Sequence, residues 1–259
     1  MKLNIVPASR GIQWVKLGMK TFFRQPLALA GLFFLFLAVM SILSMVPLLG
    51  NVLALVLLPG ATLGLMAATA EASKGNFPMP SILISAFRAG RQQLRAMLAL
   101  GGLYALGFLL VLGCSALIDG GKFAKLYLIG GNMTAELLQE GDFQTAMLVA
   151  MGLYVPLSLM FWHAPALVHW HGLPPVKSLF FSMVACLRNF WAFTLYSMAW
   201  MGVFLLMGLV ISIIAALTGS AEVMGAALYP AAMLMAAMFF TSIYFTFVDN
   251  FDTTPGETP

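Results

Sequence analysis

Three histidines are the side chains in this sequence best suited to chemistry, and they stand close together. His163, His169 and His171 lie within the string FWHAPALVHWHGLPP. Imidazole is a common metal ligand and proton carrier. These spacings, however, place no two rings on one helical turn, and no carboxylate or thiolate is near in the sequence. We therefore expect the imidazoles to bond to backbone near Pro165 and Pro174, with metal binding or proton relay as the less favoured alternative.

Three prolines interrupt long apolar stretches and could shape a cavity. Pro59, Pro156 and Pro230 each remove one backbone hydrogen bond that a helix would otherwise make. In lipid, the freed carbonyl groups must bond to neighbouring helices, to hydroxyl groups or to water in a cavity. Broken helices around a cavity are typical of transporters. Kinks that only help helices to pack are the commoner outcome.

The other residue patterns of enzymes are missing from the sequence. There is no HExxH, no GxSxG, no P-loop and no acidic cluster that could hold Mg²⁺. Apart from His163, no ionisable side chain lies within the apolar stretches, whereas ion-coupled carriers usually keep such residues there. The sequence therefore predicts no enzyme, no catalytic residue, no cofactor, no metal ion and no nucleic-acid partner.

Six apolar stretches must position these residues. Hydrophobic residues make up 61% of the chain and charged residues 8%, against about 45–50% and about 25% in soluble domains. Each stretch reaches the roughly 20 residues that a helix needs to cross a bilayer. They are Leu27–Val46, Asn51–Ala70, Ala96–Ile118, Thr145–Val168, Trp191–Leu217 and Val223–Val248. Charged residues lie outside or at the edges of all six, which predicts an all-α, polytopic transmembrane helical bundle of three hairpins.

The basic residues gather on alternate loops, which predicts an orientation. Eleven lie on the side of the two termini, and the opposite side has only Lys122 and Lys125, in a loop with four acidic residues. The positive-inside rule then places both termini in the cytoplasm of a bacterial inner membrane. The predicted parts are an N-terminal segment over 1–26, a membrane domain over 27–248 and a disordered tail over 249–259. Within the membrane domain, loops 71–95 and 169–190 would be cytoplasmic and loop 119–142 would lie outside.

Three short amphipathic segments precede the hairpins on the basic side: Ser9–Arg24, Pro80–Arg91 and Val176–Leu187. The first places apolar side chains on one helical face, namely Ile12, Val15, Met19, Phe22 and Phe23. Such a helix lies in the plane of the interface with its cations toward anionic headgroups, whereas the third segment is apolar enough to be covered by protein. The expected headgroup and orientation residues are Lys16, Lys20, Arg24, Arg88, Arg91 and Arg188. These helices could simply anchor the spans, or they could sense lipid or dock a partner.

The three hairpins share a pattern that indicates an internal repeat. A basic residue followed by an amide precedes each pair of spans, at Arg24-Gln25, Arg91-Gln92 and Arg188-Asn189. The second and third units also match at one constant offset, which aligns Gly75 with Gly172 and Pro78 with Pro175. We infer three homologous hairpins in a pseudo-three-fold arrangement.

Small residues on two spans favour close contact between helices. Gly60 and Gly64 stand one turn apart in the second span, and Ala231–Ala237 is alanine-rich. Either face could pack within the chain or against another copy in a homo-oligomer. The two cysteines, Cys114 and Cys186, fall near opposite membrane faces in this topology and are not expected to pair.

Four strings carry a resemblance to a known family: PASRGIQW from Pro7, FFRQPLAL from Phe22, FWHAPALVHWHGLPPVKSLFFS from Phe161 and ACLRNFWAF from Ala185. With these strings the chain resembles a family of uncharacterised six-span inner-membrane proteins from β-proteobacteria. The resemblance implies the fold and the location, and it implies no activity and no site residue.

Two functions remain open from the sequence. The first is a non-enzymatic scaffold or accessory subunit, whose in-plane helices and small-residue faces dock membrane partners or organise lipid. The alternative is a transporter or flippase for an apolar or amphipathic molecule or lipid, moved through a cavity lined by proline-broken helices.

Overall fold

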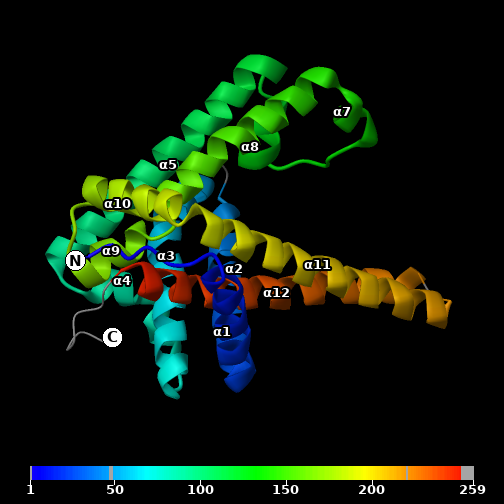
Figure 1. The fold of residues 1–259 in the computed structure, drawn as a ribbon. Coiled ribbons are helices and arrows are strands. Elements are labelled where there is room, and N and C mark those ends of the chain that lie inside the picture. The colour runs from blue at the N-terminus through cyan, green and yellow to red at the C-terminus, as the bar shows by residue number, and fades with distance from the viewer. Residues whose placement is uncertain (1, 47–48, 220, 252–259) are drawn as a thin grey trace. The chain divides into compact units, whose positions relative to one another are not determined.

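A computed structural model describes residues 2–46, 49–219 and 221–251 of the chain. Within these residues the regular structure is helical, and an isolated β-bridge joins Leu3 to Phe251. The all-α fold that the sequence predicts is therefore confirmed. Figure 1 shows the helices in chain order.

Six helical segments are long and apolar enough to cross a membrane. They are α2 (Pro26–Ser44), α3 (Leu49–Lys74), α5 (Arg91–Asp119), α8 (Gly141–Phe161) continued by α9 (Ala164–His171), α11 (Phe190–Thr218) and α12 (Ala221–Asn250). Each overlaps one predicted span. Most extend beyond the predicted bounds, because apolar patterning ends at the last apolar residue whereas the helix continues into the polar interface.

The chain divides into two compact units. Unit 1 comprises Met1–Phe34, Gly64–Leu83 and Ala185–Pro259, and unit 2 comprises Leu35–Leu63 and Ile84–Val184. Two of the membrane-spanning helices, α2 and α3, run from one unit into the other.

Unit 1 is built on the hairpin of α11 and α12, against which the short helix α1 (Arg10–Arg24) packs. Glycines allow this close approach: a Cβ added at Gly11 would lie 2.1 Å from the Ala192 carbonyl oxygen, and one at Gly18 would lie 2.4 Å from Ser242 Cβ. Between them, Trp14 is fully buried and packs its ring against Phe193 at 5.2 Å between centroids. Helix α1 is therefore part of the protein core on one of its faces.

The two ends of the described chain meet in unit 1. The Asn4 amide N–H donates to the Asn250 carbonyl at 2.9 Å, next to the bridge between Leu3 and Phe251. Asp249 and Asn250 belong to α12, and Phe251 is fully buried. The predicted disordered tail therefore begins too early at 249, because these residues are held by the N-terminal segment. Residues 252–259 lie outside the described part of the chain.

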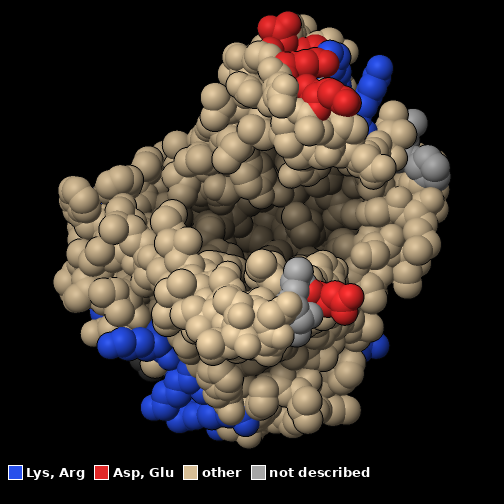
Figure 2. Space-filling model, turned by 90° about the vertical axis from the view of Figure 1, so that its right-hand side faces the viewer, with Lys and Arg blue, Asp and Glu red and all other residues tan. Residues whose placement is uncertain are grey.

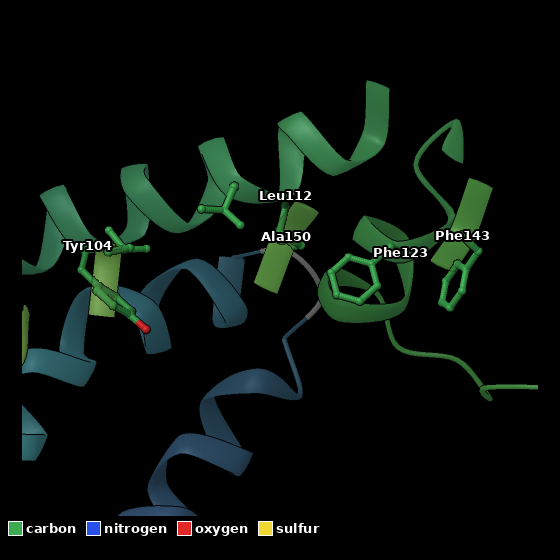
Figure 3. Packing of buried hydrophobic residues seen from close by; sticks show 7 residues of the cluster. Tyr104, Leu112, Phe123, Phe143 and Ala150 are labelled. Atoms are coloured by element: carbon green, nitrogen blue, oxygen red, sulfur yellow. The ribbon is translucent and has the colours of Figure 1, made fainter. Parts of the chain in front are cut away.

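Unit 2 is built on the hairpin of α5 and α8, with α6 (Lys122–Leu128) packed at the end where the chain passes from α5 to α8. Figure 3 shows Phe123 of α6 near Phe143 at the start of α8, with Tyr104 and Leu112 along α5 and Ala150 on α8. The rings of Phe123 and Phe143 are 6.0 Å apart between centroids, in an edge-on arrangement. This aromatic cluster closes the hairpin where the chain leaves the span.

The loop between α5 and α8 is folded rather than open. Gly120 ends α5 in the left-handed region at φ 67°, and the Thr134 side chain caps the short helix α7 (Ala135–Gln139). Asp119 accepts from the backbone N–H groups of Gly121 and Phe123, at 2.8 and 2.7 Å. The acidic side chains of this loop gather beside lysine side chains at the top of Figure 2, and Lys122 forms an ion pair with Glu140.

The second amphipathic segment differs from its prediction. Instead of one helix over Pro80–Arg91, the chain forms a 3₁₀ turn, η1 (Pro80–Ile84), and one turn of α-helix, α4 (Ser85–Arg88), before α5. The break falls at Gly90, whose φ of 106° no ordinary helical residue adopts. The third segment is the helix α10 (Pro175–Arg188).

Candidate functional site

Helix α1 has three distinct faces around its axis. Its buried face includes Trp14, Val15 and Phe22 and contacts α11 and α12. At 100° per residue, Ile12 and Phe23 form an adjacent strip whose side chains remain 41% and 64% exposed. A third face carries the exposed cations Lys16, Lys20 and Arg24. The single apolar face that the sequence predicts is thus divided, with one part packed in the protein and the other left exposed.

Helix α10 is arranged in the same way. Its buried stripe includes Ser178, Leu179, Ser182, Ala185 and Cys186. The large apolar side chains of Val176, Phe180 and Leu187 are exposed and share another face, with Lys177 and Arg188 exposed beside it. The prediction that protein would cover this helix holds for one face only. Burial also raises the pKa of the Cys186 thiol to about 12, and neither cysteine forms a disulfide in the described structure.

The remaining predicted headgroup residues are also exposed: Arg88, Arg91 and Arg188. Arg91 lies at the first turn of α5 and lines a cavity of about 640 Å³ together with Gln92 and Gln93. The opposite wall is the turn after α9, from Gly172 to Pro175. The first N–H groups of any helix have no acceptor within the helix, and at the start of α5 no capping side chain takes that place.

The three histidines do not come together as a metal site. Among the described residues, no group of three or more His, Cys, Asp or Glu side chains is placed to hold a metal ion. His163 is fully buried at the break between α8 and α9, where its backbone N–H donates to the Ser182 hydroxyl at 2.9 Å. The same hydroxyl donates to the Leu159 carbonyl at 2.8 Å. Ser182 therefore supplies hydrogen bonds that the interrupted helix lacks.

The three prolines differ in their surroundings. Pro59 is buried in α3, whereas Pro156 in α8 and Pro230 in α12 are exposed. In unit 2, a cavity of about 340 Å³ is lined by residues that lie close in sequence to Pro59 and Pro156, including Leu55 of α3 and Tyr154 of α8. The prolines themselves are not among its lining residues.

The two predicted packing glycines both face neighbouring segments of the same chain. A Cβ added at Gly60 would lie 2.4 Å from the ring of Phe87, and one at Gly64 would lie 2.6 Å from the Leu83 backbone. Each contact lies within one unit. This face of α3 is therefore occupied within the chain.

A carboxylate that the sequence reading missed binds two side chains of α1. Asp249 accepts from the Arg10 guanidinium through two hydrogen bonds of 2.7 and 2.6 Å, and from Trp14 Nε1 at 2.6 Å. These bonds raise the pKa of Arg10 above its ordinary value. The available signal was the string PASRGIQW, in which Arg10 and Trp14 stand four residues apart and so share one helical face.

In each hairpin, an amide side chain joins the two helices at the end where the basic residues lie. The sequence pattern did not predict these hydrogen bonds. The Gln25 amide donates to the Asn76 carbonyl just after α3, at 3.0 Å. The Gln93 amide donates to the His169 carbonyl near the end of α9, at 3.3 Å. The Asn189 amide donates to Asn250 at the end of α12. Gln25 and Asn189 belong to the predicted basic-amide pairs, whereas in the middle hairpin the bond comes from the residue after the pair.

The chain is similar to a protein from a Burkholderia species. It is 40% identical over 232 residues to a probable inner membrane protein of Burkholderia thailandensis, and the match covers 88% of this chain and 84% of that protein. No protein-family model matches the chain, and no solved structure matches it. The match confirms the predicted resemblance to inner-membrane proteins. The name of this relative states a location and no ligand.

Proposed function

We propose that this chain, which belongs to the same family as the probable inner membrane protein of Burkholderia thailandensis, is a non-enzymatic scaffold or accessory subunit that organises anionic lipid. The chain is a multi-pass integral protein of the inner membrane, with six helices able to span it. In this proposal both ends of the chain lie in the cytoplasm, as the distribution of Lys and Arg favours.

The division of α1 into three faces is the observation that carries this proposal. A helix that packed only in a protein core would not leave the apolar side chains of Ile12 and Phe23 exposed beside a row of cations. A helix at the membrane interface needs both, because the apolar strip enters the acyl region while Lys16 and Lys20 remain among anionic headgroups. Its buried face, which is packed on α11 and α12, fixes the helix at that depth.

Helix α10 and the start of α5 give the proposal further support. The exposed Val176, Phe180 and Leu187 of α10, next to Lys177 and Arg188, repeat the arrangement of α1. The cavity beside Arg91 is lined by amide side chains and by the uncapped start of α5, which suits the phosphate of an anionic headgroup. Phospholipid with negative charge is accordingly the proposed partner.

Charge reversal on α1 tests this proposal. The full-length protein is placed in nanodiscs of phosphatidylcholine, with and without phosphatidylglycerol, and thermal unfolding is followed. Phosphatidylglycerol is expected to stabilise the wild type. A Lys16→Glu/Lys20→Glu variant should lose at least about 2 kcal/mol of that stabilisation, because each basic residue near an anionic surface contributes about 1 kcal/mol and the new carboxylates are repelled by the same surface.

The matched control reverses two lysines in the loop between α5 and α8, in a Lys122→Glu/Lys125→Glu variant. These lysines lie among acidic side chains, so the lipid-dependent stabilisation should remain close to that of the wild type. Equal responses of both variants to phosphatidylglycerol would contradict the proposal.

A transporter or flippase remains the second candidate, and one observation favours it. The cavity of about 340 Å³ lies beside the proline-containing helices α3 and α8, as a route for an apolar molecule would require. Purified protein in liposomes with a fluorescent lipid decides between the two. Faster exchange of the lipid between leaflets than in protein-free liposomes would favour the flippase, whereas an unchanged rate would favour the scaffold.

A further inference from the structure

Unit 2 contains a cavity of about 340 Å³ that neither the scaffold nor the headgroup contacts explain. Its walls come from three membrane-spanning helices, α3, α5 and α8, and from α6, where the chain passes from α5 to α8. Four of its lining residues are labelled in Figure 3: Tyr104 and Leu112 on α5, Phe123 on α6 and Ala150 on α8. These four side chains are each less than 8% exposed. A volume of this size is within the range of small-molecule sites.

The lining of this cavity is apolar and carries no charge. Aromatic rings supply much of it, and Phe108 meets both Tyr127 and Tyr154 edge-on, at 5.8 and 6.1 Å between centroids. The Tyr104 and Tyr154 hydroxyl groups lie 3.3 Å apart and bond to each other. Little polar capacity is left for a ligand, so the cavity favours a hydrocarbon chain over a charged or sugar-like molecule.

The mouth of the cavity lies on an exposed surface of the span. Met151 and Tyr154 of α8 line the cavity and are 59% and 40% exposed. Leu148 and Val155, their neighbours on the same helix, are also exposed and apolar. Because α8 is long and apolar enough to cross a membrane, lipid acyl chains are available to an exposed apolar face of it at far higher concentration than any dissolved apolar compound.

We propose that this cavity binds one acyl chain of a membrane phospholipid, which enters from the side between Met151 and Tyr154 and lies against Leu112 and Phe123. The site is distinct from the headgroup contacts on the basic side, and it does not depend on whether the protein is a scaffold or a flippase. A chain held there would be retained when bulk lipid around the protein exchanges.

Photo-crosslinking of the full-length protein tests the site directly. The protein is placed in nanodiscs of phosphatidylethanolamine and phosphatidylglycerol in equal parts, with a trace of phosphatidylglycerol that bears a diazirine in its acyl chain. After irradiation, adducts are mapped by peptide mass spectrometry. We expect adducts on the buried Leu112 and Phe123, which lipid at the protein surface does not reach. Adducts confined to exposed side chains would overturn the proposal.

Two matched variants on α8 sharpen the test. Ala150→Phe places a ring in the cavity, whereas Gly152→Phe places the same ring in open space two residues away. Labelling of the buried side chains should fall about ten-fold in the first variant, because loss of even a few buried methylene groups costs that much affinity, and should persist in the second. Equal labelling in both variants would contradict the site.

The wild-type adduct map decides the matter even if Ala150→Phe does not fold. A free apolar diazirine probe provides the remaining comparison. If this probe labels Leu112 and Phe123 while the lipid-borne diazirine never does, the cavity takes a small apolar molecule and the proposal of an acyl chain is wrong.

Discussion

Asp249 accepts hydrogen bonds from Arg10 and Trp14, two side chains on the same face of α1. The Asp249 side chain is 17% exposed and that of Arg10 is 34% exposed, so water screens the pair only in part. A paired carboxylate in such surroundings holds α1 against the end of α12. No sequence pattern marked Asp249, because it directly follows Val248, where the last predicted span ends, and so resembles the start of a polar tail.

Replacement of Asp249 tests this contact at the residue scale. Asp249→Ala removes the acceptor of two donors and should lower the free energy of unfolding by about 1–3 kcal/mol. Thermal unfolding in detergent measures the loss. Glu136→Ala, at an exposed position on α7, is the control and should have almost no effect.

The pH dependence of this pair has a definite sign. The pKa of Arg10 is raised in the folded protein, so the contribution of the pair is fully present below the ordinary pKa of arginine. It is lost only as the pH rises through the still higher folded value. The difference between wild type and Asp249→Ala should therefore stay constant from neutral to mildly alkaline pH, and a marked decrease in that range would contradict the assignment.

At the scale of elements, α1 depends on glycine for its place against α11 and α12. Gly18 lies where a Cβ would meet both the backbone and the side chain of Ser242. Ser242 in turn bonds to the Tyr196 hydroxyl at 2.6 Å and to Trp200 Nε1 at 3.2 Å. The contact is therefore between rigid parts that have little room to move.

Gly18→Leu should displace α1 from the hairpin. Overpacking of this kind costs about 1–3 kcal/mol, and trypsin should cleave the displaced helix faster at its lysines, because a helix without its packing partner unfolds locally more often. Limited proteolysis and thermal unfolding in detergent are the measurements. Gly31→Leu is the matched control, since a Cβ at Gly31 has no atom within 4 Å. Equal trypsin sensitivity of the two variants would show that the close approach is unimportant.

Two of the segments predicted to lie in the membrane plane have similar periodicity but different structures. Helix α1 follows its predicted bounds within a residue, because its apolar and basic residues alternate over four turns. The segment over Pro80–Arg91 has a similar pattern but forms a 3₁₀ turn and a single α-helical turn. Gly90 and the prolines at the start of this segment interrupt the helix, and the spacing of apolar residues does not reveal such interruptions.

At the scale of the whole molecule, the meeting of the two chain ends requires an even number of crossings. Leu3 pairs with Phe251, so both ends must lie on one side of the membrane, and the basic residues predict the cytoplasmic side. Alkaline phosphatase fused to either end should therefore be inactive in bacterial cells, and green fluorescent protein fused there should fluoresce. Phosphatase activity at either end would refute the topology.

The three-fold repeat also belongs to this scale and stays a prediction. An amide at the start of the first span bonds to the end of the second span in every hairpin, through Gln25, Gln93 and Asn189. The shift from Gln92 to Gln93 in the middle hairpin departs from a strict repeat. Sequence offsets alone could not assign these bonds, because an offset aligns residues along the chain and does not say what their side chains reach.

By itself the sequence determined the six spans and the side on which basic residues gather. Lipid does not solvate charged side chains, so every segment long enough to cross the hydrocarbon core must exclude them. That exclusion is a property of the local sequence and can be read without knowledge of the tertiary structure. Tertiary structure alone decided which apolar face meets protein and which remains exposed, as in the separation of Val15 and Phe22 from Ile12 and Phe23 on α1. Acyl chains are as apolar as a protein core, and the two surroundings therefore select the same residue types.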